Sequence, residues 1–271
     1  MSTDSQKSAQ QKAFEVEVEV PGTPEEIWQA IATGPGVTLW FTKMEIEERL
    51  GGKVVADPNQ PIPGRVTIWE PPHTFAYEYP ETAGPHAWEF TVEAQDGGTC
   101  KVRLVDSFYV IDSDWSNEIP TGPDGWTWAF QLLVMNQTHF PGQLGASVQA
   151  MWPVPGTFAE SWAAMREQLG MPEITVGTEV TTAGTDAPAL AGTVVSYDGR
   201  VAIVKLGLPA PGLAWLATGG GSEDKSHAMV HINLFGPDAA TVAAREQPLW
   251  QAWLQRTFPL PAPAKAEAAP A

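Results

Sequence analysis

The stretch FEVEVEVPGTPEEIWQAIATGPGVTLWF (residues 14–41) joins a strand pattern directly to a helix pattern. Its first seven residues alternate apolar and acidic side chains, which is the period of an antiparallel strand with one face in water. Thr23 is a favourable N-cap, Pro24 suits the first helical position, and Glu26 completes a capping box. We therefore expect a strand followed by a capped helix that ends at the Gly-Pro-Gly of residues 34–36.

More strand patterns follow in the first half, and then a second helix pattern. Alternation in residues 87–94 puts Trp88 and Phe90 on one face and glutamates on the other. Residues 125–140 (GWTWAFQLLVMNQTHF) predict a helix that is apolar on most sides and is therefore covered on most sides. The expected strands are GGKVVA (51–56), GRVTIWE (64–70), TFAYEY (74–79), AWEFTVEA (87–94) and TCKVRLVDSF (99–108).

The second half of the chain repeats this order in a shorter form. GGKVVADPNQPIPGRVTIW (51–69) matches VGTEVTTAGTDAPALAGTVVSY (176–197) in order and nearly in spacing, and each follows a Trp-bearing helix. We expect the second copy to lack its lead strand or to have it displaced. Its expected elements are a helix over 157–169 with a capping box, strands within 173–184, 191–206 and 227–236, and a last helix from about Asp238 that is kinked or restarted at Pro248.

The same segments resemble a known family. The segment VPGTPEEIWQAIATGPGVTLWF (20–41), followed by GGKV, GRVTIWEPPHTFAYEY, GGTCKVRLVDSF and GWTWAFQLL, is similar to the heat-shock protein 90 ATPase activator homologue family (Aha-type) of the START-like (SRPBCC, Bet v-like) superfamily. The resemblance covers residues 14–140, about half the chain. It implies an α+β helix-grip fold, in which a curved antiparallel sheet wraps a long C-terminal helix around a hydrophobic cavity, followed here by a shorter degenerate second copy.

This resemblance gives an expected division of the chain. We expect a START-like domain over residues 14–145 and a truncated second START-like or α+β domain over residues 156–258. Residues 1–13 are polar and residues 259–271 form a Pro/Ala tail, so we expect both to be disordered.

Composition limits the possible functions. The chain carries 15 Lys and Arg against 32 Asp and Glu, a formal net charge of −17, which argues against binding to nucleic acid or to anionic membranes. A single cysteine, Cys100, excludes an internal disulfide framework and a cysteine-rich zinc site. With no apolar leader in residues 1–13 and no run of about 18 apolar residues, we expect a cytoplasmic protein.

Large aromatic side chains are the strongest candidates for a binding site. They belong to elements that surround the implied cavity, where tyrosine hydroxyls can orient a ligand. For any single one of them core packing is the favoured interpretation, and alternation leads us to expect some to face away from the cavity. Trp28 is interpreted as core, whereas Trp40 and Phe41 follow the break where family members place a cavity lid. The candidate ligand-binding residues are Trp40, Phe41, Trp69, Tyr77, Tyr79, Trp88, Phe90, Phe108, Trp126 and Phe130.

Other chemical signals are weak. His227 and His231 share a face but have no third ligand nearby, and the carboxylates Asp112, Asp114, Glu118 and Asp124 lack the EF-hand pattern, so we expect no metal site and no cofactor. His86 could meet a polar group of the pocket, although a surface loop is the favoured interpretation. No catalytic arrangement of residues is identifiable.

Three hypotheses remain open. The first is that the cavity binds a small hydrophobic ligand, such as a lipid, a polyketide or an aromatic metabolite. The second is a protein-interaction module that associates with a chaperone or another partner, like the namesake ATPase activator. The third is a cyclase or hydrolase that uses Tyr77, Tyr79 and His86 in the same cavity. The missing catalytic arrangement favours binding over catalysis.

Overall fold

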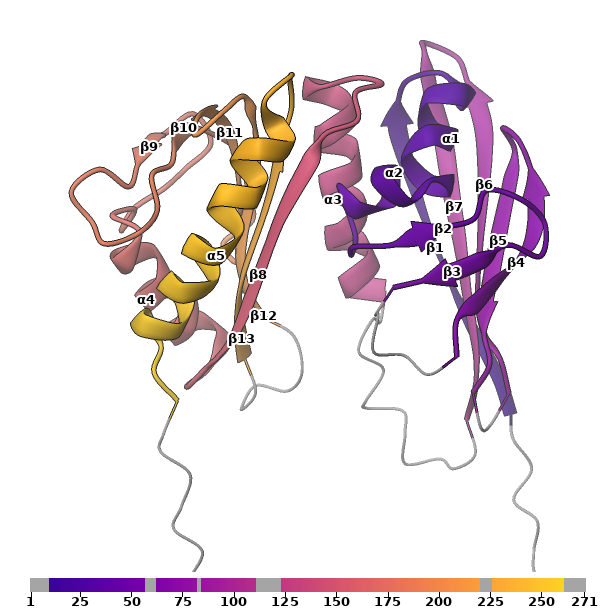
Figure 1. Ribbon diagram of the computed structural model, residues 1–271, viewed down its shortest axis with the longest axis horizontal. Coiled ribbons are helices and arrows are strands. Elements are labelled where there is room, and N and C mark those ends of the chain that lie inside the picture. The colour runs from indigo at the N-terminus through magenta and orange to yellow at the C-terminus, as the bar shows by residue number, and fades with distance from the viewer. Residues whose placement is uncertain (1–9, 57–61, 82–83, 111–122, 220–225, 261–271) are drawn as a thin grey trace, which may run out of the picture. The chain divides into compact units, whose positions relative to one another are not determined.

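The computed structural model folds into two compact units (Figure 1). Unit 1 comprises residues 1–147 with 233–240, and unit 2 comprises residues 148–232 with 241–271. No helix among the described residues is both long and apolar enough to cross a membrane. The structure describes residues 10–56, 62–81, 84–110, 123–219 and 226–260.

Unit 1 is built on one antiparallel sheet of seven strands. The strands are β1 (Gln10–Pro21), β2 (Glu45–Ile46), β3 (Lys53–Val55), β4 (Gly64–Glu70), β5 (Thr74–Tyr79), β6 (His86–Gln95) and β7 (Thr99–Val110). Their order in the sheet is β1-β7-β6-β5-β4-β3-β2. The chain therefore crosses once, from β1 to the far edge at β2, and then returns strand by strand until β7 pairs with β1.

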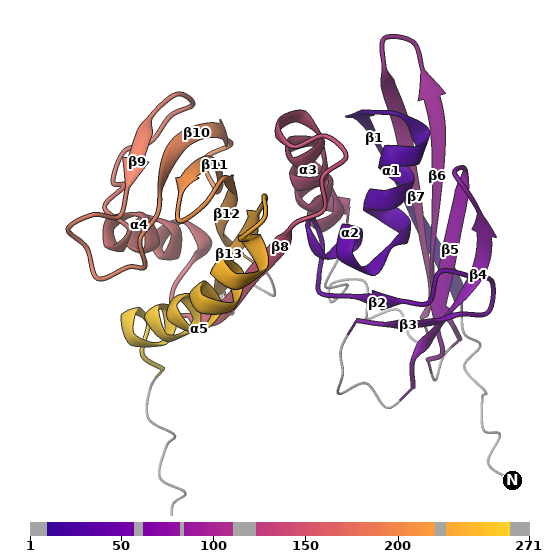
Figure 2. The same ribbon diagram turned by 45° about the horizontal axis from the view of Figure 1, so that its top comes forward.

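The helices of unit 1 are α1 (Pro24–Ala32), α2 (Gly34–Thr38) and α3 (Pro123–His139), and all three lie on one side of the sheet (Figures 1 and 2). Both halves of the expected capping box are present, between Thr23 and Glu26. Gly36 allows α2 to approach α1 closely, because a Cβ there would lie 2.0 Å from the backbone oxygen of Gln29. The aromatic ring of Trp40 is thereby directed inward, and its Nε1 donates to the backbone oxygen of Ala30 at 2.9 Å.

The second sheet follows the same order as the first, without a counterpart of β2. Its elements are β8 (Ala146–Val154), α4 (Phe158–Gln168), β9 (Glu179–Thr181), β10 (Ala191–Tyr197), β11 (Val201–Leu208), β12 (Gly212–Gly219), β13 (Ser226–Leu234) and α5 (Ala239–Thr257). The sheet order β8-β13-β12-β11-β10-β9 repeats that of β1-β7-β6-β5-β4-β3. The α+β helix-grip arrangement with a shorter, degenerate second copy is therefore confirmed.

Several local expectations were wrong. The second copy has its lead strand, β8, whose Pro153 and weak alternation hid it in the sequence. Strand β12 was missed because it is apolar along its whole length and shows no period of two, as happens when both faces of a strand are buried. Helix α5 continues through Pro248, so of the two expected effects of this proline the restart was wrong. Strand β1 begins at Gln10, and most of both expected tails lies outside the described residues.

Candidate functional site

The strand register gathers the candidate site on the helix-facing side of the first sheet. Tyr77 of β5 pairs with Trp88 of β6, Trp88 pairs with Asp106 of β7, and Asp106 pairs with Phe14 of β1. Directly paired residues of antiparallel strands point to the same face of the sheet. This row therefore places the carboxylate of Asp106 among aromatic rings, and the Asp106 side chain is wholly buried.

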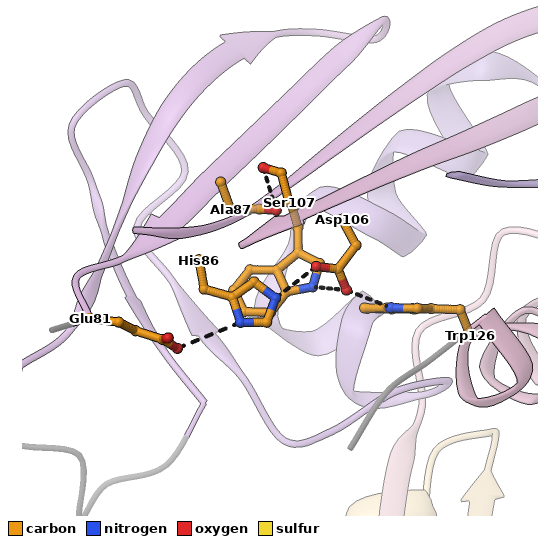
Figure 3. A network of polar contacts seen from close by, with 7 residues as sticks. Glu81, His86, Ala87, Asp106, Ser107 and Trp126 are labelled. Atoms are coloured by element: carbon orange, nitrogen blue, oxygen red, sulfur yellow. Dashed lines mark hydrogen bonds and ion pairs between the residues drawn. The ribbon is translucent and has the colours of Figure 1, made fainter. Parts of the chain in front are cut away.

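Asp106 accepts hydrogen bonds from three side chains (Figure 3). His86 Nε2 lies 2.7 Å from Asp106 Oδ1, while the indole Nε1 atoms of Trp88 and Trp126 lie 3.0 and 2.9 Å from Asp106 Oδ2. On the other side of the imidazole, Nδ1 lies 3.6 Å from Oε1 of the half-exposed Glu81. Both oxygens of this buried carboxylate therefore have hydrogen-bond partners from the protein itself.

The aromatic rings around this carboxylate are packed against one another. Trp88 is stacked between Tyr77, with ring centroids 5.1 Å apart, and His86, with centroids 3.9 Å apart. Tyr79 meets Trp88 edge-on at 5.8 Å, and Phe108 lies 5.7 Å from the imidazole. These residues form what we call the His86 end of the sheet, where β5 and β7 end and β6 begins.

The two tyrosines at this end keep their protons at neutral pH. Burial, followed by the nearby Tyr79 and Asp106, raises the pKa of Tyr77 well above its ordinary value. Burial also raises the pKa of Tyr79, and the backbone of Ala56 partly opposes this shift. The Tyr79 hydroxyl is nevertheless buried without a well-formed hydrogen bond to any described residue. An amide N–H can only donate to the phenol oxygen, so the O–H group of Tyr79 has no acceptor among the described residues.

The other candidate residues form a closed core between the middle of the sheet and α3. Trp40 stacks on Phe130 at 5.6 Å and Phe41 stacks on Trp126 at 4.7 Å, while Phe90 meets the Trp126 ring edge-on at 6.2 Å. Farther along the sheet, Trp69 meets Trp28 and Phe75 edge-on. The expected core position of Trp28 agrees with this packing.

The expectation that some strand aromatics face away from the helices was wrong. Tyr77, Tyr79, Trp88, Phe90 and Phe108 all occupy alternating positions of one parity, so the register puts them on the same face. Trp69 joins them because a register shift between Val66 and Ile68 changes the parity of β4. Alternation therefore gathered these rings on one face.

Sequence reasoning missed Asp106 and misplaced His86. Asp106 stands in the same alternating row as the buried Val102, Leu104 and Phe108, and this position could have revealed an inward-facing carboxylate. His86 is the first residue of β6 and not part of a surface loop, and its side chain is only 18% exposed. The Gly84-Pro85 turn before it obscured the start of the strand.

No group of three or more potential metal ligands occurs among the residues that the structure describes. His231 is buried on β13 beside Gln149, and His227 lies on the same strand. Of the acidic residues considered for calcium, Asp112, Asp114 and Glu118 lie outside the described residues, and Asp124 falls in the first turn of α3. The Asp106 cluster is therefore the candidate site whose polar groups could contact a ligand.

Comparison with known proteins gives structural similarities only. No family model matches the sequence, and no curated protein matches it. The di-domain ARO/CYC protein BexL of the BE-7585A biosynthetic pathway is 15% identical over 93% of this chain and 100% of its own, with a TM-score of 0.38. DynU16, from the dynemicin biosynthetic locus, is 15% identical over 89% of this chain and 95% of its own, with a TM-score of 0.39.

A third similar structure covers about half of this chain. The Aha1 protein of Colwellia psychrerythraea, solved as a dimer, is 18% identical over 48% of this chain and 98% of its own, with a TM-score of 0.40. Because all three TM-scores are below 0.5, the fold is assigned from this chain's own strand order and helix placement. Membership of the ATPase activator homologue family stays a prediction.

Proposed function

We propose that unit 1 binds a small, largely apolar ligand at the His86 end of its sheet. The observation that carries this proposal is the combination of a buried, fully bonded carboxylate and a buried phenol, Tyr79, whose O–H finds no acceptor among the described residues, on an otherwise apolar aromatic face. Ligand sites of proteins have this composition: apolar and aromatic walls with a few polar groups that fix orientation.

The cost of these polar groups supports a functional role. A buried hydroxyl without a partner costs about 1–3 kcal/mol, and an apolar side chain of the same shape would avoid that cost. A phenylalanine would fill the position of Tyr79 equally well. A ligand that accepts a hydrogen bond from Tyr79 would account for the hydroxyl.

The packing of the face favours its end over its middle. The middle is occupied by the rings that touch α3, which contact one another at centroid distances of 4.7–6.4 Å. At the His86 end, Trp88 and Phe14 are only half-buried and His86 retains some exposure. Of the predicted ligand-binding residues, Tyr77, Tyr79, Trp88 and Phe108 are therefore proposed as direct contacts.

A titration of the full chain with Nile red, a neutral dye that fluoresces strongly out of water, tests this proposal. We expect saturable binding of one dye per chain. Trp88→Leu should weaken binding about tenfold or more, because it removes the indole between Tyr77 and His86. The matched control is Trp162→Leu, which removes a buried indole of unit 2 and should leave binding unchanged.

Two outcomes would contradict the proposal. One is the absence of saturable binding, which the interaction-module hypothesis predicts. The other is an equal loss of binding in the Trp88 and Trp162 variants, which would show that the dye reports general loosening of the fold. Thermal unfolding of both variants shows that each is folded at the temperature of the titration.

A further inference from the structure

We propose that the open edge of strand β1 accepts an extended, basic segment of a partner protein as an added strand, whose lysine or arginine side chains lie beside Glu17 and Glu19. This inference does not rest on the proposed function, because the ligand site uses the helix-facing side of the sheet. It follows from three features of β1: outward-pointing backbone groups, apolar side chains that are only half-buried, and a row of acidic side chains on the outer face.

The backbone of β1 is hydrogen-bonded on one side only. It is an edge strand, and among the described residues it pairs with β7 alone. Gly22, just after the strand, donates its N–H to the backbone oxygen of Gly98 at 3.0 Å, so even-numbered residues direct their backbone groups at β7. The N–H and C=O groups of Glu17 and Glu19 therefore point to the open edge. Pro21 has the same parity, so its missing N–H costs the sheet no hydrogen bond.

The equivalent edge of the second sheet is closed by its own helix. Strand β8 has the place in that sheet that β1 has in the first. The Gln247 amide of α5 accepts from Gln149 N at 2.9 Å and donates to Gln149 O at 2.8 Å, as a neighbouring strand would. Gln251, one turn later, donates to the backbone oxygen of Met151 at 3.2 Å. No described residue closes β1 in this way, so its edge is available to another strand.

The helix-facing row of β1 is incompletely covered. Val16 and Val18 are only half-buried, whereas the residues paired with them on β7, Leu104 and Val102, are wholly buried. The difference arises because β7 has a neighbour on both sides and β1 has one. A strand added beyond β1 would place its own apolar side chains beside Val16 and Val18 and bury them further.

The outer row selects the charge of the partner. Glu17 lies 3.5 Å from Lys101 Nζ, and Glu19 accepts from the neutral hydroxyl of Thr99 at 2.7 Å. An open hollow of about 340 Å³ beside these two glutamates is also lined by Asp96. Cationic side chains of an added strand would lie across from the glutamates, and such opposite-charge pairs are favourable. A second copy of β1 would instead place glutamate opposite glutamate, so the partner is a basic strand.

The test compares two peptides of the same composition. In one peptide lysine and valine alternate, and in its isomer all the lysines precede the valines, so only the first presents one cationic and one apolar face as a strand. Calorimetric titration of the full chain in about 150 mM salt, which screens unspecific attraction, measures both affinities. We expect one alternating peptide to bind per chain, about tenfold or more tighter than its isomer.

Glu17→Ala and Glu17→Pro separate the charge from the backbone. Both remove the carboxylate, but only proline also removes an N–H that points to the open edge and does not bond to β7. We expect the alternating peptide to bind about threefold more weakly to Glu17→Ala and about tenfold or more weakly to Glu17→Pro. The matched control is Glu93→Ala, which removes the same charge from the interior strand β6 and should change the affinity by less than about twofold.

Exchanging the charges tests the inference even if the proline variant does not fold. In the double variant Glu17→Lys, Glu19→Lys, a peptide that alternates glutamate and valine should bind more tightly than the lysine peptide. Equal affinity of the wild type for the two isomers, equal losses in Glu17→Ala and Glu17→Pro, or an unreversed charge preference would overturn the inference and leave the proposed function standing. A dimer of the free chain that Glu17→Pro dissociates would also overturn it, because the occupant of the edge would then be a second copy.

Discussion

Replacing Asp106 by alanine removes the acceptor that His86, Trp88 and Trp126 share. The Trp126 side chain is wholly buried, so its N–H loses its partner with no access to water, and that alone costs about 1–3 kcal/mol. His86 and Trp88 are partly exposed and can bond water, which reduces their losses. Added to the loss at Trp126, these two smaller losses lead us to expect the free energy of unfolding to fall by about 3–5 kcal/mol.

Asp106→Asn and Glu93→Ala are the comparison variants, and both should cost less stability than Asp106→Ala. The asparagine keeps an acceptor for both indoles and should cost about 1–2 kcal/mol. Glu93 is exposed on β6, so its replacement should change stability by no more than about 0.5 kcal/mol. Urea unfolding at pH 7, followed by circular dichroism, measures the change in free energy of unfolding for each of the three variants. The change is read from the midpoint of the transition that shifts in the Asp106 variants.

The ranking of the three variants is what the network predicts. A loss of less than about 1 kcal/mol in Asp106→Ala would refute the reasoning, because it would mean that the indole and imidazole N–H groups do not depend on this carboxylate. An alanine variant that fails to fold supports the prediction only if Asp106→Asn folds and is destabilised by the smaller amount.

Three further predictions concern single residues of unit 1. Trp40→Ala should lower the free energy of unfolding by about 3–5 kcal/mol, as much as Trp28→Ala, because the buried ring of Trp40 stacks on Phe130. A loss below about 1 kcal/mol in urea unfolding would place the ring at the surface. The pKa of Tyr77 is raised in the folded state, so its contribution to stability is full below pH 10 and declines as the pH rises further. Tyr77→Phe should therefore flatten the fall of the urea midpoint between pH 10 and 11, and parallel curves for the variant and the wild type would contradict this. Thr23→Ala should cost about 1 kcal/mol by removing the cap of α1, and an unchanged midpoint would show that the cap is not needed.

The sequence predicted those parts of the fold that leave a local signature. Strict alternation marked β1 and β6, and capping boxes marked the starts of α1 and α4, where the structure shows both reciprocal bonds. Strand β12 has no such signature, because burial on both faces removes the polar half of the pattern. Local patterns thus predict half-exposed elements better than buried ones.

The candidate site was less predictable for a different reason. The aromatic residues were visible in the sequence, but only the register shows that Tyr77, Trp88 and Asp106 stand in one row. The hydrogen bond from His86 to Asp106 joins residues 20 positions apart, and no local pattern encodes it. Trp40 was expected at a cavity lid, whereas the close approach of α2 to α1 turned its ring into the core.

The central claim is that a ligand binds at the His86 end of unit 1. The most direct test follows the indole N–H signals in ¹H–¹⁵N spectra of the full chain as Nile red is added. We predict that the signals of Trp88 and Trp126, which share Asp106 as acceptor, shift in proportion to occupancy, while those of Trp162 and Trp253 in unit 2 stay in place. Unmoved Trp88 and Trp126 signals, or larger shifts in unit 2, would contradict the account.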